Sequence, residues 1–500
     1  MKRTALALAA LALAAFTRAQ DAPAPLIFRV IHTNDVHGWI MTQPGKDGRL
    51  AGGAAALKAL IDREKGPKLV LDAGDWWQGT PEGSLTKGAA VAEVFNAIGY
   101  DAVELGNHEF DAGLPALKDL IGKMGMPVLA ANVYGPNGER VPWTRPRVIK
   151  EVAGVKFGIF GLVTSHMPKL EVPARLEGLT FRRETDEARD QVKALRKEGA
   201  DVIIAITHVG YETPDKPRFE GDQTLAREVA GIDLIVGGHT HTPLKKAWRD
   251  PLHGTLVVQA GSYLTRAGVT TLRLNPKTRR VTSSSDELVD LRPEDGEDAG
   301  VKAIVARREA ELGEAFKLVV ATATAGLYRG AGHAESGLGS WMGDCLKDWA
   351  GVDAAIMNGG GIRADLPAGP VTLRGLFQVM PFDDTVIKLR MKGSLLREAL
   401  DHVIGSPRIA QLGGMTAEYR ALGRPRQRLG AVTVGGAPLD DAKTYSVATL
   451  DFLAESYPEF QAAESLTDTG TLARDVLRRC AEKQKIIAPP APGRMKALGD

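Results

Sequence analysis

Short apolar runs alternate along the chain with longer stretches in which apolar residues recur at every third or fourth position. Apolar runs of about four to eight residues are typical of buried strands, and the wider spacing is typical of helices that bury one face. The runs that predict strands are 26–32, 68–71, 102–105, 127–131, 156–162, 201–206 and 233–236. The stretches that predict helices are 51–65, 88–98, 114–123, 185–198 and 223–229. This alternation predicts an α/β fold built from layers of strands and helices.

Two further apolar runs, 255–260 and 268–274, are predicted to be antiparallel strands that close the first domain. We expect that domain to cover residues 26–292. Residues 300–316 are rich in Ala, Glu and Arg and are predicted to form one helix that links the domains. A second domain is predicted over residues 317–500, which have strand and helix patterns of their own.

The first residues have the pattern of a secretory signal. Lys2 and Arg3 precede an Ala- and Leu-rich run, which predicts a signal peptide over residues 1–19 with cleavage after Ala19. The run is shorter than the roughly 20 apolar residues of a membrane-spanning helix. Because no cysteine lies near the cleavage point, we expect no lipid anchor either. The sequence therefore predicts a secreted or periplasmic protein without a membrane anchor.

Charge and cysteine content narrow the classes of function. The chain has 63 basic and 61 acidic residues, so a wide basic face for a nucleic-acid polymer is not expected. Cys345 and Cys480 are the two cysteines. Export permits a disulfide between them, but two buried thiols are equally compatible, because sequence alone does not place them together. The oligomeric state is also left open.

Polar clusters follow five of the predicted strands. Strand ends in α/β proteins converge on one crevice, so these clusters are expected to meet there. Asp, Asn and His without Cys suit hard or borderline divalent ions such as Zn, Mn, Co or Ca. The candidate residues are Asp35, His37, Asp75, Asn107, His108, Asp111, His208, His239 and His241. Taken one by one, these motifs are equally typical of solvated loops, and Asp72 is expected to cap a turn. Together they predict a hydrolase with two metal ions.

The five motifs resemble those of the calcineurin-like metallophosphoesterases, in particular the secreted 5′-nucleotidase family that includes periplasmic UDP-sugar hydrolases. The resemblance implies a four-layer α/β/β/α catalytic domain, a linker helix and a second α/β domain that binds substrate. It implies one metal ion on Asp35, His37, Asp75 and His241, and a second on Asp75, Asn107, His208 and His239. It also implies a catalytic dyad of His108 and Asp111. The remaining histidines (His32, His166, His253, His333 and His402) are assigned structural or surface roles.

The second domain resembles the family too. The glycine-rich segment from Asn358 to Arg363 matches residues that contact base and phosphate, and Phe382 and Phe452 match two aromatics that sandwich a nucleobase. Two segments depart from the family pattern. Relatives carry an arginine where this chain has His333-Ala334, so either Arg329 replaces it or the contact is absent. Their glycine-glycine-aspartate loop is replaced here by Glu455–Glu459, which contains Ser456, Tyr457 and Pro458.

The sequence thus predicts an exported phosphoesterase that hydrolyses nucleotides by attack of metal-activated water on phosphorus. Nucleoside 5′-monophosphates lead the candidate substrates, and 2′,3′-cyclic nucleotides and UDP-sugars are further candidates. A thiosulfonate hydrolase of the sulfur-oxidation type is disfavoured, because those relatives alter the Asn-His motif that is complete here as Asn107-His108. A non-catalytic nucleotide-binding protein is disfavoured by the complete set of ligands. The native metal and the preferred substrate are left open.

Overall fold

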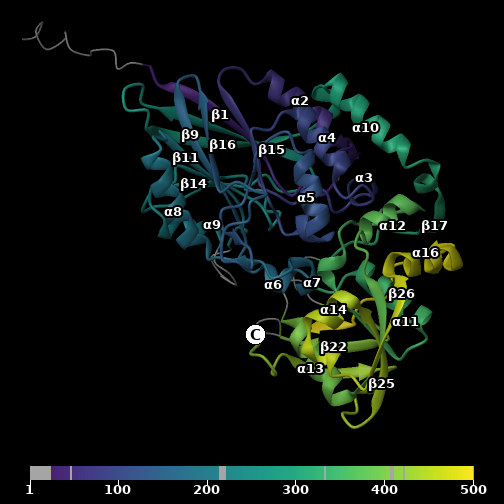
Figure 1. Ribbon diagram of the computed structural model, residues 1–500. Helices are drawn as coiled ribbons and strands as arrows, with labels where there is room; N and C mark the ends of the chain where they lie inside the picture. Colours follow the sequence, from purple (N-terminus) through teal and green to yellow (C-terminus); the bar gives the residue numbers. More distant parts are fainter. Residues whose placement is uncertain are drawn as a thin grey trace, which may run out of the picture.

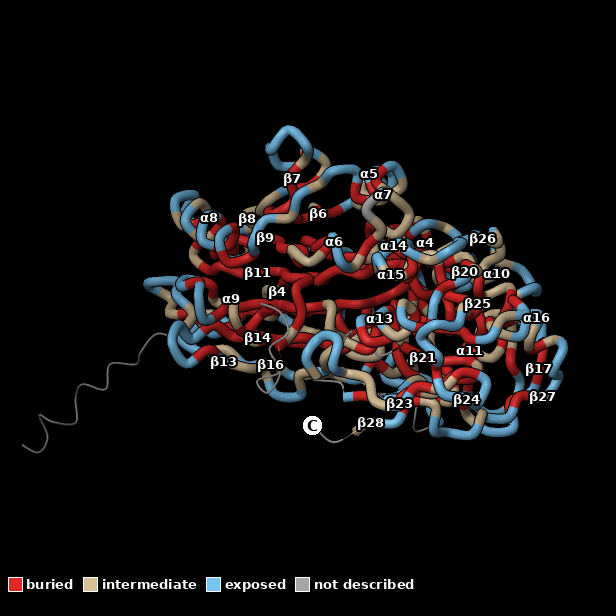
Figure 2. Tube along the Cα trace, turned by 90° about the horizontal axis from the view of Figure 1, so that it is seen from below, coloured by how far each residue is buried: buried red, intermediate tan, exposed pale blue. Residues whose placement is uncertain are grey.

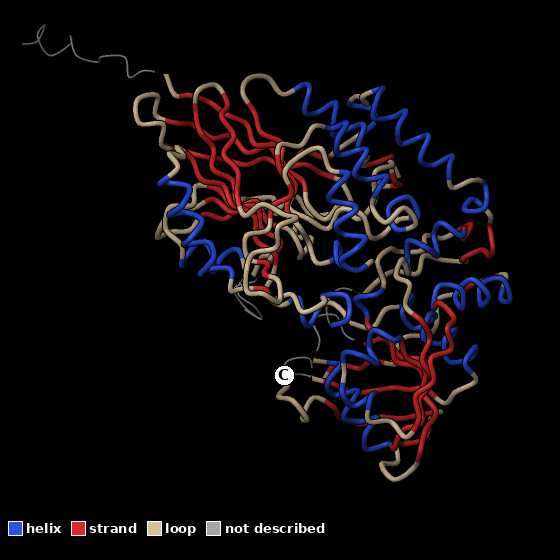
Figure 3. The backbone as a smooth tube through the Cα atoms, viewed as in Figure 1, coloured by secondary structure: helices blue, strands red, loops and turns tan. Residues whose placement is uncertain are grey.

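The computed structural model describes residues 24–45, 48–212, 221–330, 334–405, 410–420 and 423–498. The predicted signal peptide and His333 lie outside these ranges. The first half of the chain contains two six-stranded sheets between two sets of helices, and the second half forms a smaller α/β body beside it (Figure 1; Figure 3). Within the described ranges, no helix has the length and apolar character that crossing a bilayer requires.

The first sheet has the order β16-β15-β1-β4-β5-β6. Its strands are β1 (Leu26–Thr33), β4 (Lys68–Asp72), β5 (Ala102–Glu104), β6 (Val128–Leu129), β15 (Arg266–Leu274) and β16 (Val281–Asp290). The strands from β1 to β6 are parallel, whereas β15 and β16 are antiparallel to their neighbours. The prediction that 268–274 is an antiparallel strand is therefore confirmed.

The second sheet has the order β13-β14-β12-β11-β9-β8. Its strands are β8 (Arg147–Val152), β9 (Val155–Val163), β11 (Val202–His208), β12 (Leu234–Gly237), β13 (Trp248–Arg249) and β14 (Leu256–Val258). The prediction that 255–260 is an antiparallel closing strand is confirmed in part, because β14 pairs antiparallel with β13 but in parallel with β12. Residues 238–255 separate β12 from β14, a connection long enough for a parallel crossover. Apolar content marked the strand but not its direction.

Three apolar cores separate four layers. One lies between the first sheet and the helices α2 (Ala54–Arg63), α4 (Ala89–Ile98) and α5 (Gly113–Lys123). The second lies between the two sheets, and the third between the second sheet and α8 (Glu184–Lys197) and α9 (Asp222–Glu228). Side chains alternate between faces, so Ile204 fills the inter-sheet core and Ile203 the helix-side core. Strands buried on both faces therefore appear as unbroken apolar runs, and Figure 2 draws β4 and β11 as buried. The predicted α/β/β/α architecture is confirmed.

Helix α10 (Ala299–Glu311) connects the two halves and ends earlier than predicted. Asp298 caps its start by accepting a hydrogen bond from the Val301 N–H (2.8 Å). Gly313 has a left-handed φ of 74°, which breaks the helix before the short turn η3 (Glu314–Lys317). The helix packs on α2 and α4, and Arg307 and Arg308 pair with Glu93. It is thus anchored to the first half of the chain.

The second half is built around a five-stranded sheet of order β21-β18-β25-β20-β26, flanked by sheets β19-β17-β27 and β24-β23-β22-β28. Its strands are β17 (Val319–Ala323), β18 (Ala354–Asn358), β19 (Gly369–Thr372), β20 (Thr385–Lys392), β21 (Ala410–Gly413), β22 (Met415–Tyr419), β23 (Leu429–Val434), β24 (Ala437–Pro438), β25 (Thr444–Leu450), β26 (Ser465–Leu472), β27 (Ile486–Ile487) and β28 (Met495–Ala497). Two cores cover the two faces of the central sheet. Its helices are α11 (Gly337–Ala350), α12 (Leu373–Val379), α13 (Gly393–Ile404), α14 (Asp451–Ser456), α15 (Pro458–Gln461) and α16 (Ala473–Gln484).

Shorter elements connect these layers. They are α3 (Pro81–Ser84), α6 (Met167–Leu170), α7 (Pro173–Leu176), β2 (Gln43–Pro44), β3 (Leu50–Ala51), β7 (Val133–Tyr134), β10 (Thr180–Phe181), and the turns η1 (His108–Phe110), η2 (Pro293–Asp295) and η4 (Gly359–Gly361).

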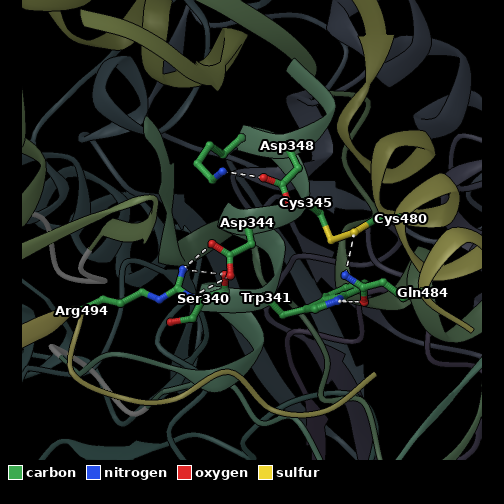
Figure 4. Close-up of a disulfide and its surroundings, with 9 residues drawn as sticks. Ser340, Trp341, Asp344, Cys345, Asp348, Cys480, Gln484 and Arg494 are labelled. Atoms are coloured by element: carbon green, nitrogen blue, oxygen red, sulfur yellow. Dashed lines mark hydrogen bonds and ion pairs between the residues drawn. A yellow bond between two sulfur atoms is a disulfide. The ribbon is translucent and has the colours of Figure 1, made fainter. Parts of the chain in front are cut away.

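A disulfide joins Cys345 on α11 to Cys480 on α16, which settles the alternative that the sequence left open (Figure 4). Polar contacts surround it. The indole N–H of Trp341 donates to Gln484 (2.9 Å), and both terminal nitrogens of Arg494 donate to the Asp344 carboxylate (2.7 Å each). The bond closes a loop with a sequence separation of 135 residues.

Replacing both cysteines by serine is expected to lower the free energy of unfolding by about 2–4 kcal/mol, because a cross-link over a long loop restricts the unfolded chain. The measurement is the guanidinium unfolding transition of the protein, followed by tryptophan fluorescence. Wild-type protein in reductant is the control, and its transition should coincide with that of the double variant. An unchanged midpoint would contradict the prediction.

Candidate metal centre and active site

The residues predicted to bind metal have an unusual backbone. Left-handed φ values occur at Asp35 (52°), His37 (51°), Asp75 (59°), His239 (76°) and His241 (55°). Such conformations cost non-glycine residues roughly 1–3 kcal/mol each and persist where the surrounding structure holds them. Here the loops after β1 and β4 hold each other, because the N–H groups of Asp35 and His37 donate to the carbonyls of Gly74 and Asp75 (2.9 Å each). Strain of this kind clusters at functional sites.

Four of these side chains form one compact group. Asp35, His37, Asp75 and His241 each offer a ligand atom, and the four atoms lie within 4.8 Å of one another. His241 Nε2 is 3.3 Å from Asp35 Oδ1, and His37 Nε2 is 3.6 Å from Asp75 Oδ2. Three strand ends supply the group, from β1 and β4 of the first sheet and from β12 of the second. The convergence expected from the sequence therefore occurs between two stacked sheets.

The remaining predicted ligands form a second group that meets the first at Asp75. His208 Nε2 is 3.1 Å from Asp75 Oδ2, the same oxygen that faces His37. The Asn107 side-chain oxygen lies 2.9 Å from His239 Nδ1, and the rings of His208 and His239 are 5.2 Å apart. One carboxylate thus lies between two groups of candidate ligands, which is the geometry of a bridging ligand.

Two histidines are oriented by backbone carbonyls. Nδ1 of His37 donates to the Gln78 carbonyl (2.8 Å), and Nδ1 of His208 donates to the Ala73 carbonyl (2.6 Å). A carbonyl only accepts, so both histidines carry a proton on Nδ1 and direct Nε2 into the centre. His208 Nε2 is buried and lies 3.1 Å from Asp75 Oδ2. A carbonyl-bound Nδ1 with Nε2 directed at the other candidate ligands is the arrangement of metal-binding histidines, so these residues fit a divalent ion.

The electrostatics set different protonation states for the candidate ligands. Burial alone would raise the pKa of Asp75, but the neighbouring His208 and His108 hold it well below its usual range. Burial and the charge of His208 lower the pKa of His239 to about 3. Burial alone would lower the pKa of His208, but Asp75 raises it to about 10. The centre therefore keeps Asp75 and His239 deprotonated and holds on His208 a proton that metal binding would release.

Glu109 holds the loops of the centre together, a role that the sequence analysis missed. Its carboxylate accepts hydrogen bonds from the N–H groups of Asp75 (2.9 Å), Trp76 (2.7 Å) and Gly106 (2.6 Å). A Cβ on Gly106 would lie 2.1 Å from Asp75 Oδ1, so this close approach requires glycine. Glu109 directly follows the Asn107-His108 pair, but nothing in the sequence shows which backbone groups its carboxylate contacts.

His108 and Asp111 meet beside the metal centre. Asp111 accepts a hydrogen bond from His108 Nδ1 (3.0 Å), and the backbone N–H of His108 donates to Asp75 Oδ1 (2.9 Å). Burial alone would lower the pKa of His108, but Asp111 and Asp75 raise it. Since Nδ1 is bound to a carboxylate, the proton for chemistry would be carried on Nε2.

The second half brings part of its predicted site to this centre. Arg363 Nη2 lies 3.0 Å from His37 Nε2, and the Phe382 ring lies 5.5 Å from the His108 ring. The side-chain oxygen of Asn358 is buried without a hydrogen bond. Phe452 is partly buried and packs against the core on one face of the central sheet, whereas Phe382 packs against the core on the opposite face. Among the described residues, no ring contact joins it to Phe382.

The two segments that depart from the family pattern also have defined places. Arg329 Nη1 donates to the Arg363 carbonyl (2.6 Å), so Arg329 lies beside the centre. Glu459 pairs with His402 (3.2 Å), which lies at the surface. Of the other histidines assigned structural roles, His32 is buried against Asp286 (3.1 Å).

Comparisons with known proteins agree with this geometry. The calcineurin-like phosphoesterase family model matches residues 28–243, and the 5′-nucleotidase C-terminal domain model matches residues 319–465. The snake venom 5′-nucleotidase of Gloydius brevicauda is 30% identical, over 93% of this chain and 88% of its own length. The chain belongs to the 5′-nucleotidase family.

Other members of the 5′-nucleotidase family are similar over comparable lengths. Protein UshA of Yersinia enterocolitica is 29% identical, over 91% of this chain and 90% of its own. A 5′-nucleotidase precursor of Thermus thermophilus has a crystal structure with a TM-score of 0.87 at 26% identity, over 95% of this chain and 100% of that one. The sulfate thiohydrolase SoxB of the same organism shares the fold (TM-score 0.80, 19% identity, 95% and 97% covered). This family member is a metal-dependent phosphoester hydrolase.

Proposed function

We propose that this family member is an exported 5′-nucleotidase that uses two divalent metal ions. The observation that carries the proposal is Asp75, whose Oδ2 faces both His37 (3.6 Å) and His208 (3.1 Å). Asp35, His37, Asp75 and His241 would hold one ion, and Asp75, Asn107, His208 and His239 the other. When bound, Zn, Mn or Co ions lower the pKa of a water molecule and neutralise phosphate charge.

The side chains around the centre would bind the phosphate, protonate the leaving group and hold the base. Arg363 has planar, paired donors that suit phosphate oxygens, and it reaches the centre from the second half. His108 would protonate the departing oxygen through Nε2. Asp111 would keep Nδ1 protonated and the ring oriented, as the carboxylate of a catalytic triad does. Phe382 presents its ring beside His108 and would stack on the base, with Phe452 as the predicted second aromatic and Asn358 as a polar contact.

Export is supported by one structural observation and one sequence prediction. The disulfide between Cys345 and Cys480 is typical of oxidising compartments. The predicted signal peptide over residues 1–19 is the second. We therefore place the proposed enzyme in the periplasm or outside the cell.

The test is product formation in the presence of Mn, Co or Zn, measured as inorganic phosphate from the monoesters, as nucleoside monophosphate from the cyclic nucleotide and the UDP-sugar, and as sulfate from the thiosulfonate. The panel consists of AMP, a 2′,3′-cyclic nucleotide, a UDP-sugar, an aryl phosphate and a thiosulfonate. The proposal expects AMP to be hydrolysed with the highest kcat/KM, and no product from the thiosulfonate, since the Asn107-His108 pair is intact. A metal-loaded protein that hydrolyses no nucleotide would overturn it. Nucleotide binding without turnover would favour the non-catalytic alternative.

Weak recognition of the ribose hydroxyls is expected within the same assay. Pro458 occupies the position where relatives have an aspartate, and it has neither a side-chain acceptor nor a backbone donor. Glu459, the nearest alternative acceptor, is paired with His402. A site that binds a hydroxyl rejects the analogue lacking it by roughly four to five decades. We expect kcat/KM for AMP to exceed that for 2′- and 3′-deoxy-AMP by at most about tenfold. A preference above about a thousandfold would contradict this and assign the hydroxyl contact to Glu459.

A further inference from the structure

Tyr263 lies where the two halves of the chain meet at the metal centre. Its N–H donates to the Asp35 carbonyl (2.8 Å), and its ring centroid lies 5.7 Å from that of His37 and 5.4 Å from that of His241. The residue has a left-handed φ of 60°, as five of the candidate ligands do. Its carbonyl accepts a hydrogen bond from Gln43 Nε2 (3.0 Å). The tyrosine is therefore held firmly within the first half.

The hydroxyl of Tyr263 reaches the second half. It donates to the backbone carbonyl of Arg363 (2.9 Å) and accepts from Arg329 Nη1 (3.1 Å). The same Arg329 nitrogen also donates to the Arg363 carbonyl (2.6 Å). Two donors, one from each half, thus converge on one carbonyl. Asp365 steadies Arg329 by accepting from its backbone N–H (2.7 Å).

That carbonyl belongs to the residue whose side chain reaches the metal centre. The Arg363 N–H donates to the Val379 carbonyl (2.9 Å), and its guanidinium lies 3.0 Å from His37 Nε2. With its N–H and carbonyl both bound, the backbone of Arg363 has a defined position relative to the first half. A displacement of about 1 Å in such a group costs an enzyme up to about 10²-fold in rate.

We propose that Tyr263 is a positioning residue for the phosphate-binding arginine. Its ring packs on two candidate ligands of the first metal ion, and its hydroxyl, together with Arg329, sets Arg363 over that ion. The residue therefore couples the docking of the second half to the geometry of the centre. This inference rests on the proposed function, in which Arg363 binds the phosphate of the substrate.

The test is a double-mutant cycle of Tyr263→Phe and Arg363→Ala in the metal-loaded full-length protein, with kcat/KM for AMP as the readout. Loss of one hydrogen bond predicts that Tyr263→Phe lowers kcat/KM about tenfold. In the Arg363→Ala background it should add less than about twofold, because the hydroxyl acts through that arginine. Metal content should be unchanged. Tyr100→Phe is the matched control, since this tyrosine is buried in the same half and its hydroxyl pairs with Thr33 (2.7 Å). It should leave kcat/KM unchanged.

Equal losses in both backgrounds, or loss of metal from Tyr263→Phe, would overturn the inference. Hydrogen exchange provides a readout that does not depend on turnover. Tyr263→Phe should accelerate amide exchange over residues 359–363, and Tyr100→Phe should not. Unchanged exchange in that segment would overturn the inference even if the wild type proved inactive. An inactive wild type with accelerated exchange would instead reject the proposed function and retain the role of Tyr263.

Discussion

Replacing His108 by alanine lowers kcat for AMP by roughly two to four decades, the contribution of a positioned acid–base group. The expectation follows from its place beside the centre. Asp111 binds Nδ1 (3.0 Å), so the ring presents Nε2 to the substrate, and Phe382 packs beside it. The ring of His108 belongs to neither group of candidate metal ligands, because only its backbone N–H contacts Asp75 (2.9 Å). The variant should therefore retain its metal.

The measurement combines kcat and KM for AMP with elemental analysis of the purified protein. His253→Ala is the control, since His253 is exposed and lies outside the centre. An aryl phosphate with a good leaving group sharpens the test, because it needs less protonation and should lose less activity than AMP. Wild-type kcat in His108→Ala, or a variant that has lost its ions, would show that the assigned role is wrong.

Exhaustive chelation is expected to abolish phosphate release, and Mn, Co or Zn is expected to restore it. Asp75→Ala should have a larger effect on metal content than any other single ligand substitution, because the carboxylate faces both groups of ligands. We expect this variant to bind fewer ions than the wild type and to lose activity with every metal. His241→Ala, which alters one group only, should retain the ion of the other.

Metal stoichiometry by elemental analysis and phosphate release after metal addition provide the two readouts. Asp72→Asn is the matched control, since Asp72 ends β4 just before the loop that carries Asp75 but bonds to Thr33 (2.6 Å) and to the Gly74 N–H (3.0 Å). It should bind the wild-type number of ions. Full activity in protein shown to be free of metal would refute the dimetal mechanism.

Local periodicity was sufficient to predict an α/β fold for this protein, whereas the four-layer arrangement followed from the family resemblance. An unbroken apolar run such as 201–206 marks a strand buried on both faces, and helices that bury one face supply the outer layers. The clusters at strand ends were also visible, because the carboxyl ends of parallel strands share one edge of a sheet. Asp35, His37, Asp75 and His241 could therefore be named before their distances were known, and the structure brings them together.

Contacts between distant segments required the tertiary structure. Periodicity reports which face of an element is buried but not the direction of its neighbours, which is why the parallel pairing of β14 with β12 was not predicted. Periodicity also gives no information about residues that come into contact only when the layers pack together. Tyr263 reaches Arg363 across 100 positions, and Cys345 meets Cys480 across 135. The sequence by itself predicted most helices and strands of the first half and the polar residues that follow five of those strands. Only the packing of sheets and halves decided which backbone carbonyl, hydroxyl or thiol each of those residues meets, because burial stabilises a face without selecting its partner.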